Sequence, residues 1–324
     1  MDWQTASVGL WLYRSKNCVL DVTFGSVTGY SSHFENDSDP TPLMNKTLLE
    51  TAASSSSRWK CLRINATEQR LADLQNMTTL SLASLEELIV QSNGYNSSRS
   101  PARVDIPQSF LQLSAPRLRH LTLAGIQTNF SSVFVVWSQL TRLNLRETGG
   151  PYKLAELCHL LSLCSQLVYA IIEPHRRPYQ GPPWDDSDDI EEPIEDDEFV
   201  AVSLPYLRSL NIAIEPQCRH RSGFDTFSML AVQELGFFWS SKFKTPLVSV
   251  VQSCTLRDLH LSMGIISDSE LIECNRTLLQ MLSLPDESGN TLCPKLEVFE
   301  CHPSQSVTST LYTDQGVLEF VEAK

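Results

Sequence analysis

Apolar residues recur along the chain in triplets at offsets 0, 3 and 5, and polar residues separate each triplet from the next. Residues two apart face the same side of a strand, whereas residues five apart lie about 140° from each other on a helix. Each triplet therefore predicts a short strand with two buried residues and a first anchor that folds beneath it. The eleven triplets are Val19-Val22-Phe24, Trp59-Leu62-Ile64, Leu85-Leu88-Val90, Leu118-Leu121-Leu123, Leu140-Leu143-Leu145, Leu167-Ala170-Ile172, Leu207-Leu210-Ile212, Val232-Leu235-Phe237, Leu256-Leu259-Leu261, Leu279-Leu282-Leu284 and Leu296-Phe299-Cys301.

The spacing of the triplets is close to that of a leucine-rich repeat. First anchors are 17 to 40 residues apart, and most steps fall in or near the range of about 20–29 residues. The two steps of 40 residues contain visible insertions, a candidate helix at Pro42–Ala53 and an acidic stretch at 175–199. Apolar residues at helical spacing from Leu154 to Cys164 predict a further helix directly before the triplet that begins at Leu167.

Three or four anchors per unit cannot offset the ordering entropy of some 25 residues, so such units fold only when they stack. The pattern favours an α/β fold: a leucine-rich-repeat solenoid (horseshoe) with parallel strands on the concave face and helices or irregular turns on the convex face. We predict a single domain over residues 1–324, with an acidic disordered loop at 175–199. The alternative is an unrelated α/β domain in which the triplets arose by chance.

The charge and the cysteine content of the chain limit the classes of partner and the cellular compartment that the sequence predicts. The formal net charge is −13, and ten acidic residues lie between Asp185 and Glu198, which leaves −3 for the rest of the chain. There is no basic stripe of the kind that nucleic-acid binders carry, so no nucleic-acid partner is expected. The nine cysteines are irregularly spaced, and Cys158, Cys164 and Cys274 occupy core-like positions, which favours buried thiols over a disulfide framework.

The sequence shows neither a signal peptide nor an apolar stretch long enough to cross a membrane. We therefore expect a cytoplasmic or nuclear protein without a membrane partner.

Nine segments resemble, in this order, the F-box/leucine-rich-repeat-like family of mushroom-forming fungi. They are LWLYRSKNCVLDVTF, SSSSRWKCLRI, SAPRLRHLTLAG, WSQLTRLNL, LCSQLVYAII, VSLPYLRSLNI, VQSCTLRDLHLSMGIISDSELIE, LCPKLEVFEC and DQGVLEFVEAK, and together they cover nearly the whole chain. The resemblance implies the substrate-recognition repeat region of an F-box-type component of a ubiquitin ligase. Unlike regular leucine-rich repeats, this chain mostly lacks the Asn or Cys that follows the strand, with Asn65 as one exception, so irregular turns are expected.

In that family an F-box upstream of the WLYRS-like segment docks to the adaptor of a cullin-type ligase. Only ten residues precede Trp11, so no F-box fits before it. We expect either an F-box encoded further upstream, in which case the adaptor is a partner, or a scaffold with no ligase link.

Chemistry-bearing motifs are absent from the sequence. It contains no GxGxxG, GxxxxGK[ST], HExxH, GxSxG or CxxC. We therefore expect no catalytic site, no cofactor and no metal, and a protein that is not an enzyme. The remaining alternative is an α/β hydrolase whose site assembles from distant segments, which a strand order other than sequential would favour.

Polar residues that flank the second and third anchors are predicted to point away from the core, where a protein substrate or partner would bind. The candidate binding residues are Arg63, His120, Arg142, Asn144, Arg146, Tyr169, Asn211, Asp258 and His260. Basic residues dominate the first half of this set, whereas Glu234, Asp258 and Glu300 make the second half acidic. The pattern favours a polarised concave surface; the alternative is that polar residues simply occupy exposed strand positions.

Overall fold

The fold is described by a computed structural model. The described residues are 3–25, 46–66, 80–92, 104–105, 115–127, 135–146, 154–173, 201–213, 227–228, 231–239, 255–263 and 295–303. The chain divides into two compact units, Met1–Gly150 and Pro151–Lys324, and each is described by itself below. The single domain over 1–324 stays a prediction, and the acidic segment 175–199 lies outside the described residues.

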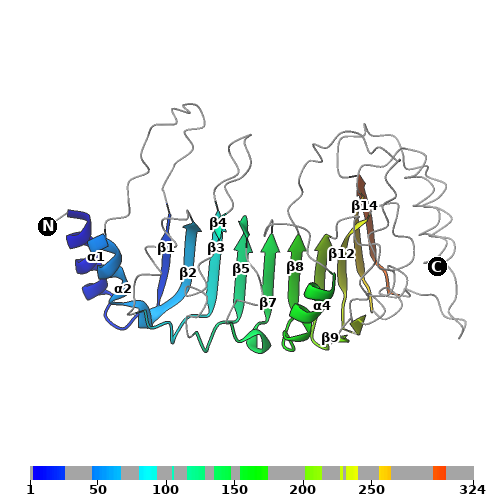
Figure 1. The fold of residues 1–324 in the computed structure, drawn as a ribbon, viewed down its shortest axis with the longest axis horizontal. Helices are drawn as coiled ribbons and strands as arrows, with labels where there is room; N and C mark the ends of the chain where they lie inside the picture. The colour runs from blue at the N-terminus through cyan, green and yellow to red at the C-terminus, as the bar shows by residue number, and fades with distance from the viewer. Residues whose placement is uncertain are drawn as a thin grey trace, which may run out of the picture. The chain divides into compact units, whose positions relative to one another are not determined.

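The first unit is built on a parallel sheet in which strands follow one another in sequence order (Figure 1). Its strands are β1 (Leu20–Phe24), β2 (Trp59–Ala66), β3 (Glu87–Ser92), β5 (His120–Ala124) and β7 (Arg142–Arg146). The helices α1 (Trp3–Arg14) and α2 (Lys46–Ala53) pack on each other at the β1 edge. Short 3-10 turns precede two strands, η1 (Ser56–Arg58) and η5 (Trp137–Gln139), and β4 (Val104–Asp105) pairs with β6 (Ile126–Gln127).

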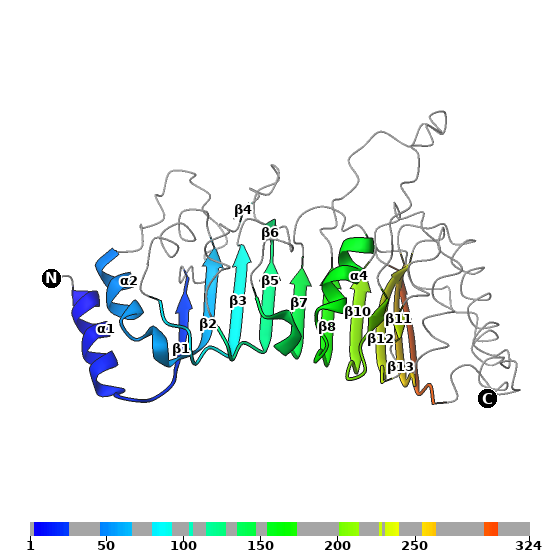
Figure 2. The ribbon, with the colours of Figure 1, turned by 60° about the horizontal axis from the view of Figure 1, so that its bottom comes forward.

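The second unit repeats this plan after one helix, α4 (Leu154–Ser162) (Figure 2, green to orange). Its parallel strands are also in sequence order: β8 (Tyr169–Glu173), β10 (Ser209–Ala213), β12 (Glu234–Trp239), β13 (Asp258–Met263) and β14 (Val298–Pro303). A short pair, β9 (Val202–Ser203) and β11 (Phe227–Ser228), lies apart from them in its own sheet. The predicted α/β class with parallel strands is therefore confirmed.

The predicted helices are confirmed in part, and one helix was missed. The helix predicted from Leu154 to Cys164 is α4, which ends at Ser162. The helix predicted at Pro42–Ala53 is α2, which is described from Lys46 onwards. The triplet pattern gave no indication of α1.

The anchors form the core of each unit. All three members are buried in Trp59-Leu62-Ile64, Leu85-Leu88-Val90, Leu118-Leu121-Leu123, Leu140-Leu143-Leu145, Leu167-Ala170-Ile172 and Leu207-Leu210-Ile212. Val232, Leu235, Leu256, Leu259 and Leu296 are buried too, while the side chains of the remaining members of their triplets lie outside the described set. Each fully buried aliphatic side chain contributes about 1.5–3 kcal/mol to folding, so stacking of the triplets is the main source of stability.

A tight turn positions the first anchor of six strands. The amide of Leu140 donates to the carbonyl oxygen of Trp137 over 3.1 Å, a bond between residues three apart. The same turn closes at Trp59, Leu85, Leu118, Leu167 and Leu207. The residue three positions before the anchor is itself buried in five of these six turns, as Ser56, Leu82, Trp137, Cys164 and Leu204. The repeat therefore has a fourth buried position that the triplet pattern did not include.

A second recurring hydrogen bond connects neighbouring strands from β3 to β7 and from β8 to β14. The carbonyl oxygen of Glu86, just before β3, accepts from the successive amides of Arg119 and His120 at the start of β5, over 2.9 and 3.0 Å. The same two-donor arrangement recurs at the carbonyls of Arg119, Val168, Arg208, Gln233 and Arg257. Because neighbouring strands start in the same way, side chains at equivalent positions line up in rows across each sheet.

One triplet does not behave as predicted. Val19 is 63% exposed, and Leu20 is buried in its place, because the register between β1 and β2 shifts by one residue after the Leu20–Trp59 pair. The prediction of Val19 as an anchor is therefore wrong. Leu279-Leu282-Leu284 lie outside the described part of the chain, so the strand predicted there stays a prediction.

The buried cysteines agree with the prediction where the structure describes them. Cys61, Cys158 and Cys164 are buried, Cys18 is exposed, and Cys274 lies outside the described residues. Burial raises the pKa of the Cys164 thiol to about 12, so this thiol is protonated at neutral pH. Of the helices that the structure describes, none has the length and apolar character needed to cross a membrane.

Candidate binding surface

Side chains that alternate with the buried anchors form the outer strand face of each unit. In the first unit they lie in two rows of register partners. One row is Asp21, Cys61, Glu87, His120 and Arg142, and the other is Thr23, Arg63, Ile89, Thr122 and Asn144. Arg146 lies beyond them at the end of β7. Strands of a parallel sheet are about 4.8 Å apart, so partners within a row are near enough to interact directly.

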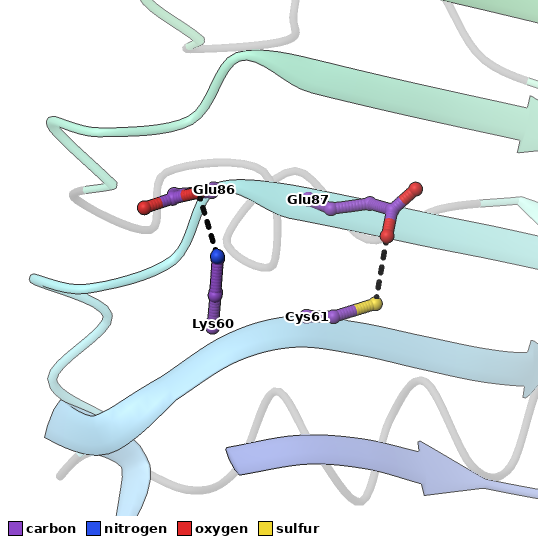
Figure 3. A network of polar contacts seen from close by, with 4 residues as sticks. All are labelled: Lys60, Cys61, Glu86 and Glu87. Atoms are coloured by element: carbon purple, nitrogen blue, oxygen red, sulfur yellow. Dashed lines mark hydrogen bonds and ion pairs between the residues drawn. The ribbon is translucent and has the colours of Figure 1, made fainter. Parts of the chain in front are cut away.

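The β2 and β3 side of this face holds a thiol, a carboxylate and a guanidinium (Figure 3 shows the first two). The Cys61 thiol donates to Glu87 Oε2 over 3.0 Å, and an Arg63 guanidinium nitrogen lies 3.9 Å from the same oxygen. Burial, followed by the hydrogen bond to Glu87, raises the pKa of Cys61, while Arg63 opposes the shift. Cys61 is therefore a protonated hydrogen-bond donor rather than a nucleophile.

A second ion pair lies where these two strands begin. Lys60 Nζ is 3.5 Å from Glu86 Oε2, and both side chains are about half exposed (Figure 3). Exposed pairs of this kind contribute about 0–1 kcal/mol, so this contact orders the edge of the surface more than it stabilises the fold.

The β5 and β7 side of the face is basic, and we call His120, Arg142 and Arg146 the basic face. Arg142 and Arg146 are exposed, and His120 is half-buried beside Arg142. Two further exposed arginines, Arg117 and Arg119, precede β5. The sequence from 106 to 146 contains no Asp or Glu, so β5 and β7 themselves contribute no negative charge to this face.

The environment of His120 keeps its imidazole neutral at pH 7. Burial, followed by the charge of Arg142, lowers the pKa of His120 below its usual value of 6.5, and Glu87 and Glu86 only partly oppose this. The positive charge of the basic face therefore resides on its arginines.

Replacing Arg142 by glutamine is expected to raise the pKa of His120, because a repulsive positive charge is removed. The matched control is Arg146→Gln, which removes an exposed arginine from the same strand and should leave the titration unchanged. The measurement is an NMR titration of the imidazole resonances in both variants. Equal titration curves for wild type and Arg142→Gln would contradict the assigned cause.

The same shift predicts how stability depends on pH. Because the pKa of His120 is lowered in the folded protein, the unfolded chain takes up the proton more readily. The contribution of His120 to the free energy of unfolding is therefore complete above pH 6.5 and is lost as the pH falls through the folded pKa. Arg142→Gln should therefore reduce the loss of stability on acidification.

In the second unit the outer strand face turns acidic toward its C-terminal strands. One row is Tyr169, Ser209, Glu234, Asp258 and Val298, and the other is Ile171, Asn211, Gly236, His260 and Glu300. Tyr169 and Asp258 are half-buried, Asn211, Glu234 and His260 are exposed, and the Glu300 side chain lies outside the described set. All nine candidate binding residues thus alternate with core anchors; the role of these residues in binding stays a prediction.

Two glycines on the outer strand face make room for asparagine side chains, a feature that the sequence reasoning missed. A Cβ built on Gly236 would lie 2.9 Å from Asn211 Cγ on the neighbouring strand, and one on Gly25 would lie 2.6 Å from Asn65 Nδ2. Asn211 therefore lies across Gly236 of the following strand, and Asn65 lies across Gly25 at the end of the preceding strand. A larger residue at either glycine would displace the asparagine. The sequence could have indicated this contact, since a glycine and an asparagine occupy corresponding outward-facing positions of two neighbouring predicted strands.

The chain matches no protein-family model and no curated protein. In the part of the chain that the structure describes, no three His, Cys, Asp or Glu side chains gather where they could hold a metal ion. The features that bear on function are therefore the repeated strands and the charges that they display.

Proposed function

We propose that the chain is a leucine-rich-repeat solenoid (horseshoe) that binds a protein partner on its outer strand face, as the substrate-recognition repeat region of an F-box-type ubiquitin-ligase component. The observation that carries the scaffold proposal is the recurrence of one connection between strands, with the same turn and the same two-donor carbonyl in both units. Repeat scaffolds are built in this way, and they use their extended strand surfaces for binding.

The basic face suggests the chemistry of the partner. Arginine presents five donors in a planar fork that pairs with carboxylates in two-pronged fashion. Arg142 and Arg146 lie four residues apart on β7 and face the same side, with the Asn144 amide between them. An extended acidic segment along β7 would meet a guanidinium at each end and an amide in the middle, so we favour an acidic protein segment as the ligand.

The proposed link to a ubiquitin ligase rests on the resemblance of the ordered segments to the F-box/leucine-rich-repeat-like family. The alternative, a scaffold with no ligase link, uses the same surface. Binding to the purified adaptor of a cullin-type ligase separates the two, because only the first requires it. A full-length protein that retains its acidic partner but does not bind the adaptor would favour the alternative.

The test of the scaffold function compares proteins captured from cells that produce the chain. Wild type is compared with Arg142→Glu/Arg146→Glu, and the control is Arg208→Glu/Arg257→Glu, which reverses two exposed arginines that precede β10 and β13. We expect proteins with acidic segments to be captured by wild type and control and to fall at least tenfold with the first variant. Cross-links from the captured protein should map to β5 and β7. An identical set of proteins with all three baits would overturn the proposal.

A further inference from the structure

The N-terminal helix α1 displays large apolar side chains to solvent. Trp3 is 73% exposed, Leu10 50%, Trp11 54% and Tyr13 79%. Trp3, Leu10 and Trp11 are spaced by seven and eight residues and therefore lie on one face of the helix. The opposite face is turned inward, with Thr5 buried and Gly9 beside Thr51 of α2. Exposed clusters of this kind commonly mark interaction sites in folded proteins.

The C-terminal end of α1 is held to the body of the first unit by a guanidinium. Arg58 donates to the carbonyl oxygens of Leu12, over 3.4 Å, and of Lys16, and to Ser15 Oγ, over 3.1 Å. A cation at this end also complements the helix dipole. Arg58 immediately precedes the fully buried Trp59, so α1 is fixed to a rigid part of the core. A preorganised apolar face binds a partner with a smaller entropic penalty than a mobile one.

Charge restricts what can cover this face. Residues 3–20 contain no Asp or Glu, and Arg14 and Lys16 are exposed at the end of the helix. Two copies of α1 facing each other would offer these cations no acidic partner in either orientation. An anionic membrane would attract them but repel a chain with a net charge of −13. A protein segment with apolar and acidic side chains satisfies both the aromatic cluster and the two cations.

We propose that the outer face of α1, formed by Trp3, Leu10 and Trp11, docks an amphipathic helix of a partner protein whose apolar stripe is flanked by Asp or Glu. The apolar stripe packs on the aromatic rings, and the acidic flank pairs with Arg14 and Lys16. This docking site is independent of the basic face and would hold even if the outer strand face binds nothing.

The probe is a displayed library of helical peptides, selected on the full-length protein and counter-selected on Leu10→Ser/Trp11→Ser. We expect enriched peptides to carry apolar residues at i, i+3, i+4 and i+7 with acidic neighbours. An enriched peptide, measured by fluorescence anisotropy, should bind at least tenfold more weakly to Leu10→Ser/Trp11→Ser and several-fold more weakly to Arg14→Glu/Lys16→Glu. The control Tyr206→Ser changes an exposed aromatic residue of the second unit and should leave affinity unchanged.

Four outcomes would overturn the proposal: no enrichment, peptides without acidic bias, binding that does not depend on Leu10 and Trp11, or equal loss with Tyr206→Ser. Two further measurements test the other occupants of this face. Binding to vesicles of phosphatidylserine and phosphatidylcholine that requires Trp11 would assign the face to membranes. A dimer in sedimentation that Leu10→Ser/Trp11→Ser abolishes would assign it to a second copy. Hydrogen exchange of the β2 and β3 amides should be unchanged in the variants, since the substituted side chains lie outside the core.

Discussion

Replacing Trp59 by alanine is expected to lower the free energy of unfolding by about 3–5 kcal/mol, the range found for large aromatic residues removed from cores. Trp59 is 0% exposed and begins β2, where it pairs with Leu20 of β1. Its ring centroid lies 5.7 Å from that of Phe24 in an edge-to-face arrangement, which adds about 0.5–1.5 kcal/mol beyond area burial. Its Nε1 donates to Ser55 Oγ over 3.1 Å, so the substitution also leaves a buried hydroxyl without this donor.

The measurement is urea denaturation combined with hydrogen exchange of the β1 and β2 amides, which should lose protection first. Trp59→Phe retains an aromatic ring and loses only the indole hydrogen bond and part of the volume, so we expect a smaller loss than for alanine. Trp3→Ala removes the same side chain from an exposed position and should change stability by no more than about 0.5 kcal/mol. Similar losses for Trp59→Ala and Trp3→Ala would show that the triplets do not form the core.

The parallel strands were predictable because core packing requires the same spacing of buried anchors in every repeat. Each strand can bury its inward-facing anchors only against the equivalent anchors of the neighbouring strands, so the sequence must repeat the anchor spacing. Helix α4 was predictable for the same reason, since Leu157 and Leu161 enter the core one turn apart. The buried position three residues before the first anchor, for example Leu82 or Trp137, is also present in the sequence. It could not be recognised before the turn was observed, because apolar residues such as leucine are common at other positions too.

Other features depend on information that local spacing does not contain. A single-residue shift in register moved burial from Val19 to Leu20, and nothing in the triplet distinguishes the two. Helix α1 was missed because its large apolar side chains face outward, while its inner face uses Thr5 and Gly9. Amphipathic periodicity identifies helices that bury their apolar face, and α1 does the opposite.

The outer strand face was predictable as a set of positions but not as a set of contacts. Alternation along a strand correctly placed Arg63, His120 and Arg142 away from the core. The pairing of Cys61 with Glu87, and the effect of Arg142 on His120, depend on which strand lies beside which and in what register. Aligned triplets do give that register, since Cys61 and Glu87, like His120 and Arg142, occupy the same triplet offset. The hydrogen bond and the pKa shift depend in addition on side-chain geometry, which the spacing does not contain.

Replacing Arg58 by methionine is expected to release α1 from the first unit while the sheet stays folded. The substitution removes hydrogen bonds to two carbonyl oxygens and to Ser15 Oγ, and it removes one of the cations at the end of the helix. Hydrogen bonds that involve a charged group contribute about 1.5–3 kcal/mol. Because Arg58 is only half-buried and water can replace part of these contacts, we expect a loss near the lower end of that range.

The expected signature is local. Amides of α1 should exchange faster in Arg58→Met, while amides of β2 and β3 keep their protection, since the Trp59-Leu62-Ile64 anchors are untouched. Arg58→Lys keeps the cation but has no planar fork to reach several acceptors at once, so its effect should be intermediate. Arg63→Met removes an exposed arginine from the same stretch and should leave α1 unchanged. If α1 is a docking platform, Arg58→Met must also weaken binding of the selected helical peptide without altering any residue of the docking face. Faster exchange with unchanged peptide affinity would mean that rigidity contributes nothing to this site.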